Sequence, residues 1–425
     1  MASSNRVVIS GLGFITSIGN DKTAVTTSLR ELRHGIERVD FGGPTRPIEV
    51  KVAGTIKNFD TSSPYWSKWR YPADYKFGPA TLRSLAPHGL YATCATQQAI
   101  ADALLSPAEV SGEETALFCC SGGSHSMSRH FLNVMHDAPD MRASPLGVVS
   151  SIVGTLNFNL GTQFKIRGGN CGFVSACASS SHALGYACDE IRLGRFERVI
   201  VVGAEDMDAD SVVPFMSMKA LSACDDPACA SRPFDRKRDG FVGTGGAAVM
   251  IVESGASAAR RGVVPYAELL GWAQSADGHN LAMPHPEGDG LARAMRRTLR
   301  DCGLTPADIG YITAHATSTP QGDRAEAIAL HEVFTKAGAH PAVSSTKGLT
   351  GHPLSMSGAM EAAFCALALR DGFVPGNAHL DEADPICDGL NLPRTTLARS
   401  PGIVLSNSSG FGGSNVVLAL GPWSS

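Results

Sequence analysis

The stretch SHALGYACDEIRLG, residues 181–194, and the stretch RVIVVGAEDM that follows it, residues 198–207, decide the fold class. The first is typical of a helix that ends at a glycine, and the second, rich in valine and isoleucine, is typical of a buried strand. Further strands are predicted at 6–15 and 247–253, and a further helix at 91–105. Because strands that alternate with helices form largely parallel, buried sheets, the sequence predicts an α/β fold.

The chain divides most readily within VESGASAARRGV, residues 252–263, where small and basic residues follow a predicted strand. Placing the division at residue 255 gives an N-terminal half, 1–255, and a C-terminal half, 256–425. VVISGLGFITSIG near the N-terminus and IVLSNSSGFGGSN near the C-terminus are both strands that run into glycine-rich turns. This faint echo indicates that the two halves are related.

Composition limits the function classes. The 425 residues are 43% hydrophobic and 18% charged, which is typical of a globular protein. The formal net charge of −4 argues against broad, non-specific binding of nucleic acid, although a local basic patch for an acidic partner stays open. Eleven scattered cysteines and a start without a secretory signal predict a reducing cytosol. No apolar run approaches the roughly 20 residues of a membrane helix.

Cys177 differs from the other ten cysteines in its position at a predicted turn. An extended segment precedes it, and the small residues after it lead directly into a helix. The positive end of a helix dipole lowers the pKa of a thiol, so Cys177 is a candidate nucleophile. The alternative, a buried structural cysteine, fits five others better. These are Cys94, Cys119, Cys120, Cys188 and Cys365.

Two further segments contain side chains that could take part in catalysis. YITAHATSTPQGDRAEAIAL, residues 311–330, places His315 in a loop of hydroxyl residues after a strand, and Asp323 and Glu326 are predicted in the first turn of the next helix. SSTKGLTGHPLSMSGAMEAAF, residues 344–364, places a lysine and a histidine on either side of a glycine turn. Taken separately, these histidines also fit ordinary hydrogen-bonded surface or helix-end residues.

Other clusters fit metal or dinucleotide sites poorly. The spacings of His125, His130 and His136 do not match a helical ligand pair. Cys224 and Cys229 are separated by four residues, without a second ligand pair in the sequence nearby. The glycines of GFVGTGGAAV do not open a helix after a strand, as a dinucleotide site requires. We therefore expect neither a metal nor a nicotinamide cofactor.

Taken in chain order, six motifs resemble those of the β-ketoacyl-[acyl carrier protein] synthases of the KAS I/II type, the elongating condensing enzymes of fatty-acid and type II polyketide synthesis. They are VVISGLGFITSIGND (7–21), SACASSSHALG (175–185), RPFDRKRDGFVGTGGAAVMIVE (232–253), HATSTPQGD (315–323), STKGLTGHPLSMSGAMEA (345–362) and NSSGFGGSN (407–415). Several long motifs in one order over nearly the whole chain are far more specific than any single motif.

The resemblance implies a thiolase-like fold, in which two pseudo-repeated α/β halves stack in five layers, αβαβα, usually as a dimer. It implies a catalytic group of Cys177, His315 and His352, with the nucleophile in the N-terminal half and the histidines in the C-terminal half. By the same resemblance, Lys347 and Glu326 are expected to form an ion pair that orients the histidines.

The implied enzyme is an acyltransferase that catalyses decarboxylative Claisen condensation of a malonyl thioester with an acyl chain held on Cys177. The backbone N–H groups of Cys177 and Phe411 would form the oxyanion hole, and Phe411 would also be the gate between the two half-reactions. Thr317 and Thr319 would bind the pantetheine arm. No cofactor is expected beyond the phosphopantetheine of an acyl carrier protein, which is the expected partner of this cytoplasmic enzyme.

The chain departs from the family pattern at several positions. Ser409 replaces a phenylalanine that many relatives carry before the gate, which should free space or add polarity there. Gly123 stands where some relatives place a bulky residue that closes the acyl pocket, and with Phe215 and Ser409 it is assigned to that pocket. Arg83 and Lys219 are the candidates for docking the acidic carrier protein; two solvated surface charges are the alternative.

Three functions remain in competition. The first is the condensing enzyme, in fatty-acid or in polyketide and polyene synthesis. The second is an acyltransferase of the same fold that transfers without decarboxylation. The third is a non-catalytic chain-length partner subunit, which would lack the cysteine that is present here. A homodimer is expected, and a heterodimer with a homologous subunit stays open; neither nucleic acid nor a membrane is an expected partner.

Overall fold

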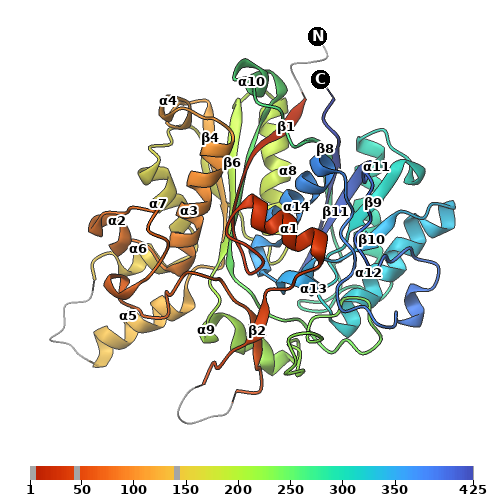
Figure 1. The fold of residues 1–425 in the computed structure, drawn as a ribbon, viewed down its shortest axis with the longest axis horizontal. Coiled ribbons are helices and arrows are strands. Elements are labelled where there is room, and N and C mark those ends of the chain that lie inside the picture. The colour runs from red at the N-terminus through yellow and green to blue at the C-terminus, as the bar shows by residue number, and fades with distance from the viewer. Residues whose placement is uncertain (1–5, 43–47, 138–143, 425) are drawn as a thin grey trace.

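The computed structural model describes residues 6–42, 48–137 and 144–424 (Figure 1). Its strands are β1 Val7–Ile15, β2 Ile36–Arg38, β3 Val52–Gly54, β4 Thr115–Cys120, β5 Asn170–Gly172, β6 Arg198–Glu205, β7 Gly246–Ser254, β8 Ala267–Ala276, β9 Ile309–Thr313, β10 Ala342–Ser344, β11 Ile403–Gly410 and β12 Ser414–Gly421. Its helices are α1 Lys22–Glu31, α2 Pro79–Arg83, α3 Pro87–Asp102, α4 Pro107–Val110, α5 His125–Asp137, α6 Gly147–Ser151, α7 Thr155–Gln163, α8 Ser179–Arg192, α9 Ala209–Val212, α10 Gly255–Arg260, α11 Asp289–Asp301, α12 Pro320–Val333, α13 Lys347–Thr350 and α14 Ser357–Asp371.

The ten-stranded sheet consists of two halves with the same topology. Its order is β10-β9-β11-β12-β8-β1-β7-β6-β4-β5, so each half places its five strands in the relative order 3-2-4-5-1. The directions repeat as well: β4 runs parallel to β5 and β6, while β7 is antiparallel to β6 and β1. In the C-terminal half, β9 runs parallel to β10 and β11, while β12 is antiparallel to β11 and β8. The predicted pseudo-repeat is therefore confirmed, although the exact division at residue 255 stays a prediction.

The helices build the predicted five layers around these halves. α8 and α14 contact strands of both halves and so form the central layer, which lies between the two halves in Figure 1. α3 covers the outer face of the N-terminal half on β1, β6 and β7, and α11 packs on β8 and β12 with α12 beside it. The two halves join where β1 and β8 pair over two residues.

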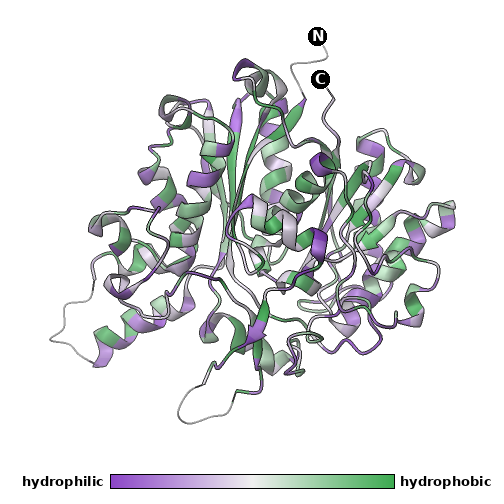
Figure 2. Cartoon of the chain, in the orientation of Figure 1, coloured by the Kyte–Doolittle hydropathy of each residue, from purple (hydrophilic) through white to green (hydrophobic). Residues whose placement is uncertain are grey.

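Small residues allow the layers to pack closely. A Cβ on Gly13 would lie 1.9 Å from the carbonyl oxygen of Ala95, and one on Gly11 would lie 2.4 Å from that of Ala99. The glycines of SGLGF thus permit α3 to lie directly on β1. α14 is buried along residues 357–369, which explains its apolar, alanine-rich sequence. Figure 2 shows the same pattern, with hydrophobic residues concentrated along the strands and the inner helices.

The local predictions agree with these elements. The predicted strands at 6–15, 198–207 and 247–253 correspond to β1, β6 and β7, and the predicted helices correspond to α3 and α8. Gly194, just beyond α8, has a positive φ of 68°, the left-handed conformation expected after a helix. Among the described residues, no helix combines the length and the apolar character that crossing a bilayer requires.

Candidate active site

A strained turn presents Cys177. Between β5 and α8, Ala176 adopts a positive φ of 50°, which is uncommon for a residue with a Cβ. Ser179 holds the turn: its Oγ accepts the N–H of Ser175 at 2.8 Å and donates to the carbonyl of Ala176 at 2.6 Å. The end of β11 approaches closely, since a Cβ on Gly410 would lie 3.1 Å from the Cys177 nitrogen. The turn therefore places Cys177, the candidate nucleophile, beside the glycine-rich loop of the C-terminal half.

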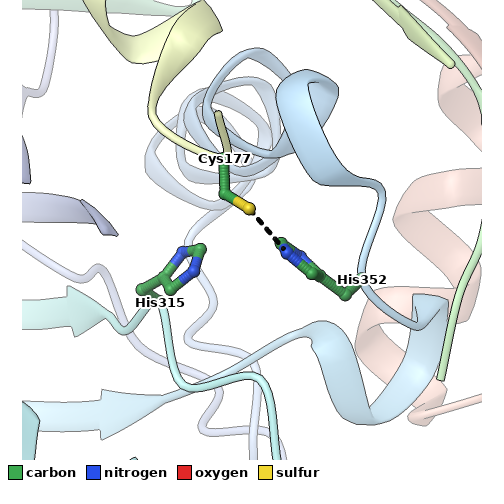
Figure 3. A group of neighbouring side chains, drawn as sticks. All are labelled: Cys177, His315 and His352. Carbon is green, nitrogen blue, oxygen red and sulfur yellow. Dashed lines mark hydrogen bonds between the residues drawn. The ribbon is translucent and has the colours of Figure 1, made fainter. Parts of the chain in front are cut away.

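Two histidines from the C-terminal half converge on this cysteine (Figure 3). His352 Nε2 lies 3.1 Å from Cys177 Sγ, and its Nδ1 lies 3.2 Å from the hydroxyl of Ser357. The ring of His315, in the loop after β9, lies edge-on to that of His352 with centroids 5.3 Å apart. The fold thus brings together the three side chains that the sequence places 138 and 37 residues apart.

Both imidazoles are held neutral by their surroundings. Burial lowers the pKa of His315 and of His352 well below the usual value, and the positive charge of Lys347 lowers each further. A neutral imidazole has one N–H donor and one lone pair, so it can either accept a proton or donate a hydrogen bond. The pair is therefore suited to stabilise negative charge on a substrate oxygen.

The expected ion pair between Lys347 and Glu326 is wrong. Lys347 Nζ instead pairs with the carboxylate of Glu361, and both side chains are fully buried. The oxygens of Glu326 bind elsewhere: they accept the backbone N–H groups of His315 at 3.0 Å and Ala316 at 2.7 Å, and the amide of Asn407 at 3.0 Å. Glu326 consequently positions the His315 loop through its backbone, and Lys347 places its charge next to the histidines.

The placement of Glu326 in the first turn of its helix also needs correction. α12 begins at Pro320, so Asp323 lies in the first turn and Glu326 in the second. Asp323 accepts the N–H of Ser318 at 3.1 Å and that of Phe234 at 2.8 Å. The two carboxylates therefore divide the task of holding the loop after β9.

The pKa of Cys177 is opposite to the sequence expectation. The helix dipole was expected to lower it, but burial raises the pKa of the Cys177 thiol to about 12, and the charge of Lys347 offsets only part of that rise. Desolvation of the thiolate thus outweighs the favourable charges nearby. A raised pKa favours the neutral thiol form of Cys177, and the adjacent imidazole of His352 can accept the thiol proton.

This raised pKa predicts how the alkylation of Cys177 depends on pH. Because the thiolate is the reactive form and its fraction grows about tenfold per pH unit below the pKa, the rate with iodoacetamide should rise steadily from pH 7 to pH 9.5. Peptide mass spectrometry of the protein alkylated for timed intervals measures this rate at Cys177 alone. A rate that levels off near pH 7 would show a lowered pKa and contradict the burial argument.

A cavity of about 170 Å³ opens onto the three side chains. Its walls include most of the residues that were assigned to substrate binding, namely Thr317, Thr319, Phe215, Ser409, Phe411 and Lys219. A hollow of about 620 Å³ lies elsewhere, beside α5 and α9, and contains none of the catalytic candidates. The chemistry therefore belongs to the smaller cavity.

Two predicted residues lie outside that cavity. Gly123 is packed against the backbone of the segment after α6, where a Cβ would lie 2.7 Å from the carbonyl oxygen of Ser151. It does not line the cavity at Cys177, and its assignment to the acyl pocket stays a prediction. Arg83 lies on α2 with its guanidinium 5.6 Å from the ring of Trp66, away from the cavity mouth that Lys219 lines.

Ser409 adds polarity near Phe411, the residue expected to be the gate. Its Oγ donates to Asn415 Oδ1 at 2.8 Å, and the amide of Asn415 donates to Asp277 at 2.7 Å. The loop that carries Phe411 also contacts the segment that follows Asp277, because the N–H of Gly412 donates to the carbonyl of Leu281 at 2.8 Å. Of the two effects expected from Ser409, added space and added polarity, the structure shows the second, because Ser409 hydrogen-bonds to Asn415.

The three side chains could also hold a metal ion. Each of the three offers one ligand atom, and these three atoms all lie within 4.8 Å of one another. Nitrogen and thiolate donors suit zinc. A zinc ion there would occupy the nucleophile, so it would act as an inhibitor of acyl transfer.

Sequence reasoning missed three residues that contact the catalytic elements. Glu361 was visible as the one carboxylate near the centre of an otherwise apolar helix segment. Glu205 ends β6 and accepts the N–H groups of Gly122 and Ser355, each at 3.2 Å, and burial raises its pKa to about 7. His182, the third, follows Cys177 by five residues, and nothing in its local pattern distinguishes it from a helix-surface histidine.

His182 positions the turn that carries Cys177. Its Nδ1 lies 2.7 Å from the hydroxyl of Ser175, and its Nε2 lies 2.8 Å from Gln274 Oε1. Since that amide oxygen can only accept, Nε2 carries the proton and Nδ1 accepts from Ser175. Burial lowers the pKa of His182, which keeps this tautomer neutral.

Replacing His182 with alanine should slow acyl transfer to Cys177 by about tenfold to a hundredfold, because a misplaced nucleophile loses its alignment. Decarboxylation of a malonyl thioester should be nearly unchanged, since His182 touches neither His315 nor His352. Rapid-quench mass spectrometry and carbon dioxide release measure the two rates. His182→Asn, which keeps an acceptor near Ser175, should recover part of the loss. Equal losses in both rates would indicate a general folding defect instead.

Comparison with known proteins finds matches along nearly the whole chain. Residues 4–258 match the family model described as Beta-ketoacyl synthase, N-terminal domain, and residues 266–381 match Beta-ketoacyl synthase, C-terminal domain. The chain is 36% identical over 420 residues to 3-oxoacyl-[acyl-carrier-protein] synthase 1 of Escherichia coli strain K12, covering 98% of each chain.

Two solved structures extend the comparison. A beta-ketoacyl synthase from Burkholderia phymatum superposes with a TM-score of 0.89 at 29% identity, covering 99% of this chain and 100% of that one. The ishigamide ketosynthase/chain length factor superposes with a TM-score of 0.86 at 29% identity, with the same coverage. The thiolase-like ketosynthase fold is therefore confirmed.

Proposed function

This chain belongs to the β-ketoacyl synthase family, and we propose that Cys177, His315 and His352 are the residues that carry out its condensation. The enzyme is an acyltransferase of the 3-oxoacyl-[acyl-carrier-protein] synthase type, which elongates acyl chains in fatty-acid or polyketide synthesis. The observation that carries the residue assignment is the approach of His352 Nε2 to Cys177 Sγ at 3.1 Å, with His315 beside them.

Acyl transfer comes first. The thiol proton of Cys177 passes to His352 Nε2 while the sulfur attacks the thioester carbonyl of the acyl carrier. The oxyanion that forms is bound by the backbone N–H groups of Cys177 and Phe411, and such donors are each worth about 2.7–4 kcal/mol of barrier. The tetrahedral intermediate collapses, the pantetheine sulfur leaves, and the proton on His352 departs with it as the carrier thiol. His352 is then neutral again.

Decarboxylation of the malonyl thioester follows. Breaking the bond to the carboxylate releases carbon dioxide and leaves the electron pair as an enolate. His315 donates a hydrogen bond to the enolate oxygen, and His352 does so in the tautomer that carries its proton on Nε2, with Nδ1 accepting from the hydroxyl of Ser357. Because both imidazoles are neutral, neither repels the developing negative charge as a carboxylate would. The carbanion attacks the acyl thioester, the carbon–carbon bond forms, and the Cys177 sulfur leaves as a thiolate that takes up one proton from solvent. No cofactor is required, since loss of carbon dioxide supplies the carbanion.

The carrier protein reaches the site through the cavity mouth. Thr317 and Thr319 line the passage with hydroxyl groups 3.1 Å apart, which suits the amides of a pantetheine arm. Lys219 is exposed at the rim in a left-handed conformation, with φ 53°, and offers a positive charge to an acidic carrier. Arg83 contributes to a more distant part of this docking face.

We assign a dimer to the free edge of the sheet. β5 is the last strand of the sheet order, and its residues 170–172 are exposed. Apolar side chains flank it: Val174 is 73% exposed and Phe158 is 46% exposed. A second copy that adds its own β5 would bury both. A homologous subunit is the other candidate, because the ishigamide relative is a ketosynthase/chain length factor. Cytoplasmic location stays a prediction.

Mass spectrometry of the intact protein tests the proposed reaction. A panel of acyl-carrier thioesters should load a single chain on wild-type protein, and malonyl-carrier protein should then release a product longer by two carbons. The best-loaded chain identifies the substrate class. Loading without extension would favour a transferase that does not decarboxylate. Failure of every chain to load would exclude action by this chain alone.

A further inference from the structure

Cys224 and Cys229 form a close pair of thiols outside the active site. They lie in the loop CDDPAC between the short 3₁₀ segment 213–218 and β7, and their Sγ atoms are 3.1 Å apart. Both are partly exposed, so small solutes can reach them. The proposed condensation uses neither sulfur.

The loop itself brings the two sulfurs together. The carbonyl of Asp226 accepts the N–H groups of Cys229 at 3.1 Å and Ala230 at 3.0 Å, and its carboxylate accepts the N–H of Ala228 at 3.0 Å. Pro227 fixes one φ within this turn. The turn is therefore held by its own hydrogen bonds, which keep the two sulfurs close together.

We propose that Cys224 and Cys229 are a reversible dithiol–disulfide site. Its disulfide form restrains residues 230–232, which contact the loop that carries His315 and the start of α13. A disulfide requires sulfurs about 2.05 Å apart, which a small closure reaches from the present separation. Two thiolates on one tetrahedral zinc ion would lie about 3.8 Å apart, because each Zn–S bond is about 2.3 Å. Within the described part of the chain, no third histidine, cysteine or carboxylate converges on these two sulfurs. Geometry and ligand number both favour the disulfide.

The charges around the pair assign an order to the exchange. Arg232 Nη2 lies 3.8 Å from Cys224 Sγ, where a guanidinium stabilises a thiolate. Cys224 therefore attacks a low-molecular-weight disulfide such as oxidised glutathione, and one glutathione thiolate leaves. Cys229 then attacks the mixed disulfide at Cys224 and releases the second glutathione, which takes up the proton. Two thiols are oxidised and one disulfide is reduced, so the step balances.

The residues that follow the pair connect it to the active site. Ser231 Oγ donates to the carbonyl of Lys347 at 2.7 Å, and the N–H of Arg232 donates to Ser318 Oγ at 3.0 Å. Ser318 lies between the two threonines of the proposed pantetheine passage, and Lys347 begins α13. The disulfide would link Cys229 directly to Cys224 just before Ser231 and Arg232. The chain that leads into these two residues then has less conformational freedom, so their motion is reduced.

Thiol trapping on the full-length protein tests the site. Cys171→Ser removes an exposed competing thiol and serves as the common background. After incubation with oxidised glutathione, free thiols are blocked with N-ethylmaleimide and the peptides are weighed. The peptide with both cysteines should be lighter by two hydrogens and lose both maleimide additions, and dithiothreitol should restore them. Cys229→Ser should instead accumulate a glutathione adduct on Cys224, because the resolving thiol is gone.

Other outcomes would overturn the proposal. Two maleimide additions after oxidation would show that no disulfide forms, and a stable glutathione adduct on the Cys171→Ser background would show that Cys229 does not resolve it. Protection that needs added Zn²⁺ and leaves the peptide mass unchanged would make the pair a metal site. Hydrogen exchange compares residues 230–232 in the oxidised and reduced forms; unchanged rates would refute the restraint.

Discussion

Cys177→Ala should lower the rate of condensation by about 10⁴-fold or more, because without a nucleophile no acyl-enzyme can form. Decarboxylation of the malonyl thioester should continue, since His315 and His352, which stabilise the enolate, remain in place. Carbon dioxide release and β-ketoacyl product are measured in the same reaction. The variant thereby separates the two half-reactions that the wild-type enzyme couples.

His352→Ala is the matched comparison, because it touches both half-reactions. It removes the imidazole 3.1 Å from the sulfur and one of the two donors to the enolate. Acyl loading and carbon dioxide release should therefore both fall, in contrast to Cys177→Ala. If Cys177→Ala still produced a β-ketoacyl chain, or if His352→Ala lost only one activity, the assigned roles would be incorrect.

Lys347→Met should destabilise the protein by about 3–5 kcal/mol, because it leaves the fully buried carboxylate of Glu361 without its partner. Burial raises the pKa of Glu361 to about 7 even beside the lysine, and removing the lysine raises it further. The folded variant therefore binds a proton at a pH where the unfolded chain does not. Its free energy of unfolding should rise, relative to wild type, as the pH falls from 8 to 6. Guanidinium denaturation at both pH values measures this.

The double variant Lys347→Met, Glu361→Leu distinguishes the observed ion pair from the one first expected. Replacing a buried pair with apolar residues is often nearly neutral, so this variant should recover most of the lost stability. The matched control is Lys347→Met, Glu326→Gln. It should recover none, since Glu326 binds backbone N–H groups and Asn407 rather than the lysine. Recovery in the control alone would restore the original pairing.

The pattern of the sequence was sufficient for the fold class, and its motifs predicted which residues gather at the site. Alternating strands and helices predict the α/β layers because hydrophobic periodicity is a local property. Local pattern alone left the roles of Cys177, His315 and His352 open, and it was the resemblance of their motifs, taken in order, to a known family that predicted them as one site. The buried cysteines were also predicted correctly from their apolar neighbours.

Tertiary structure alone decided which groups meet and how strongly each is desolvated. Lys347 could have paired with Glu326 or with Glu361, and only the tertiary structure, which brings Lys347 to Glu361 of α14, selects Glu361. The sequence predicts that a helix begins just after Cys177, but it does not predict the burial that raises the pKa of the Cys177 thiol. Desolvation and long-range pairing depend on the distances between elements that are far apart along the chain, and local sequence does not contain those distances.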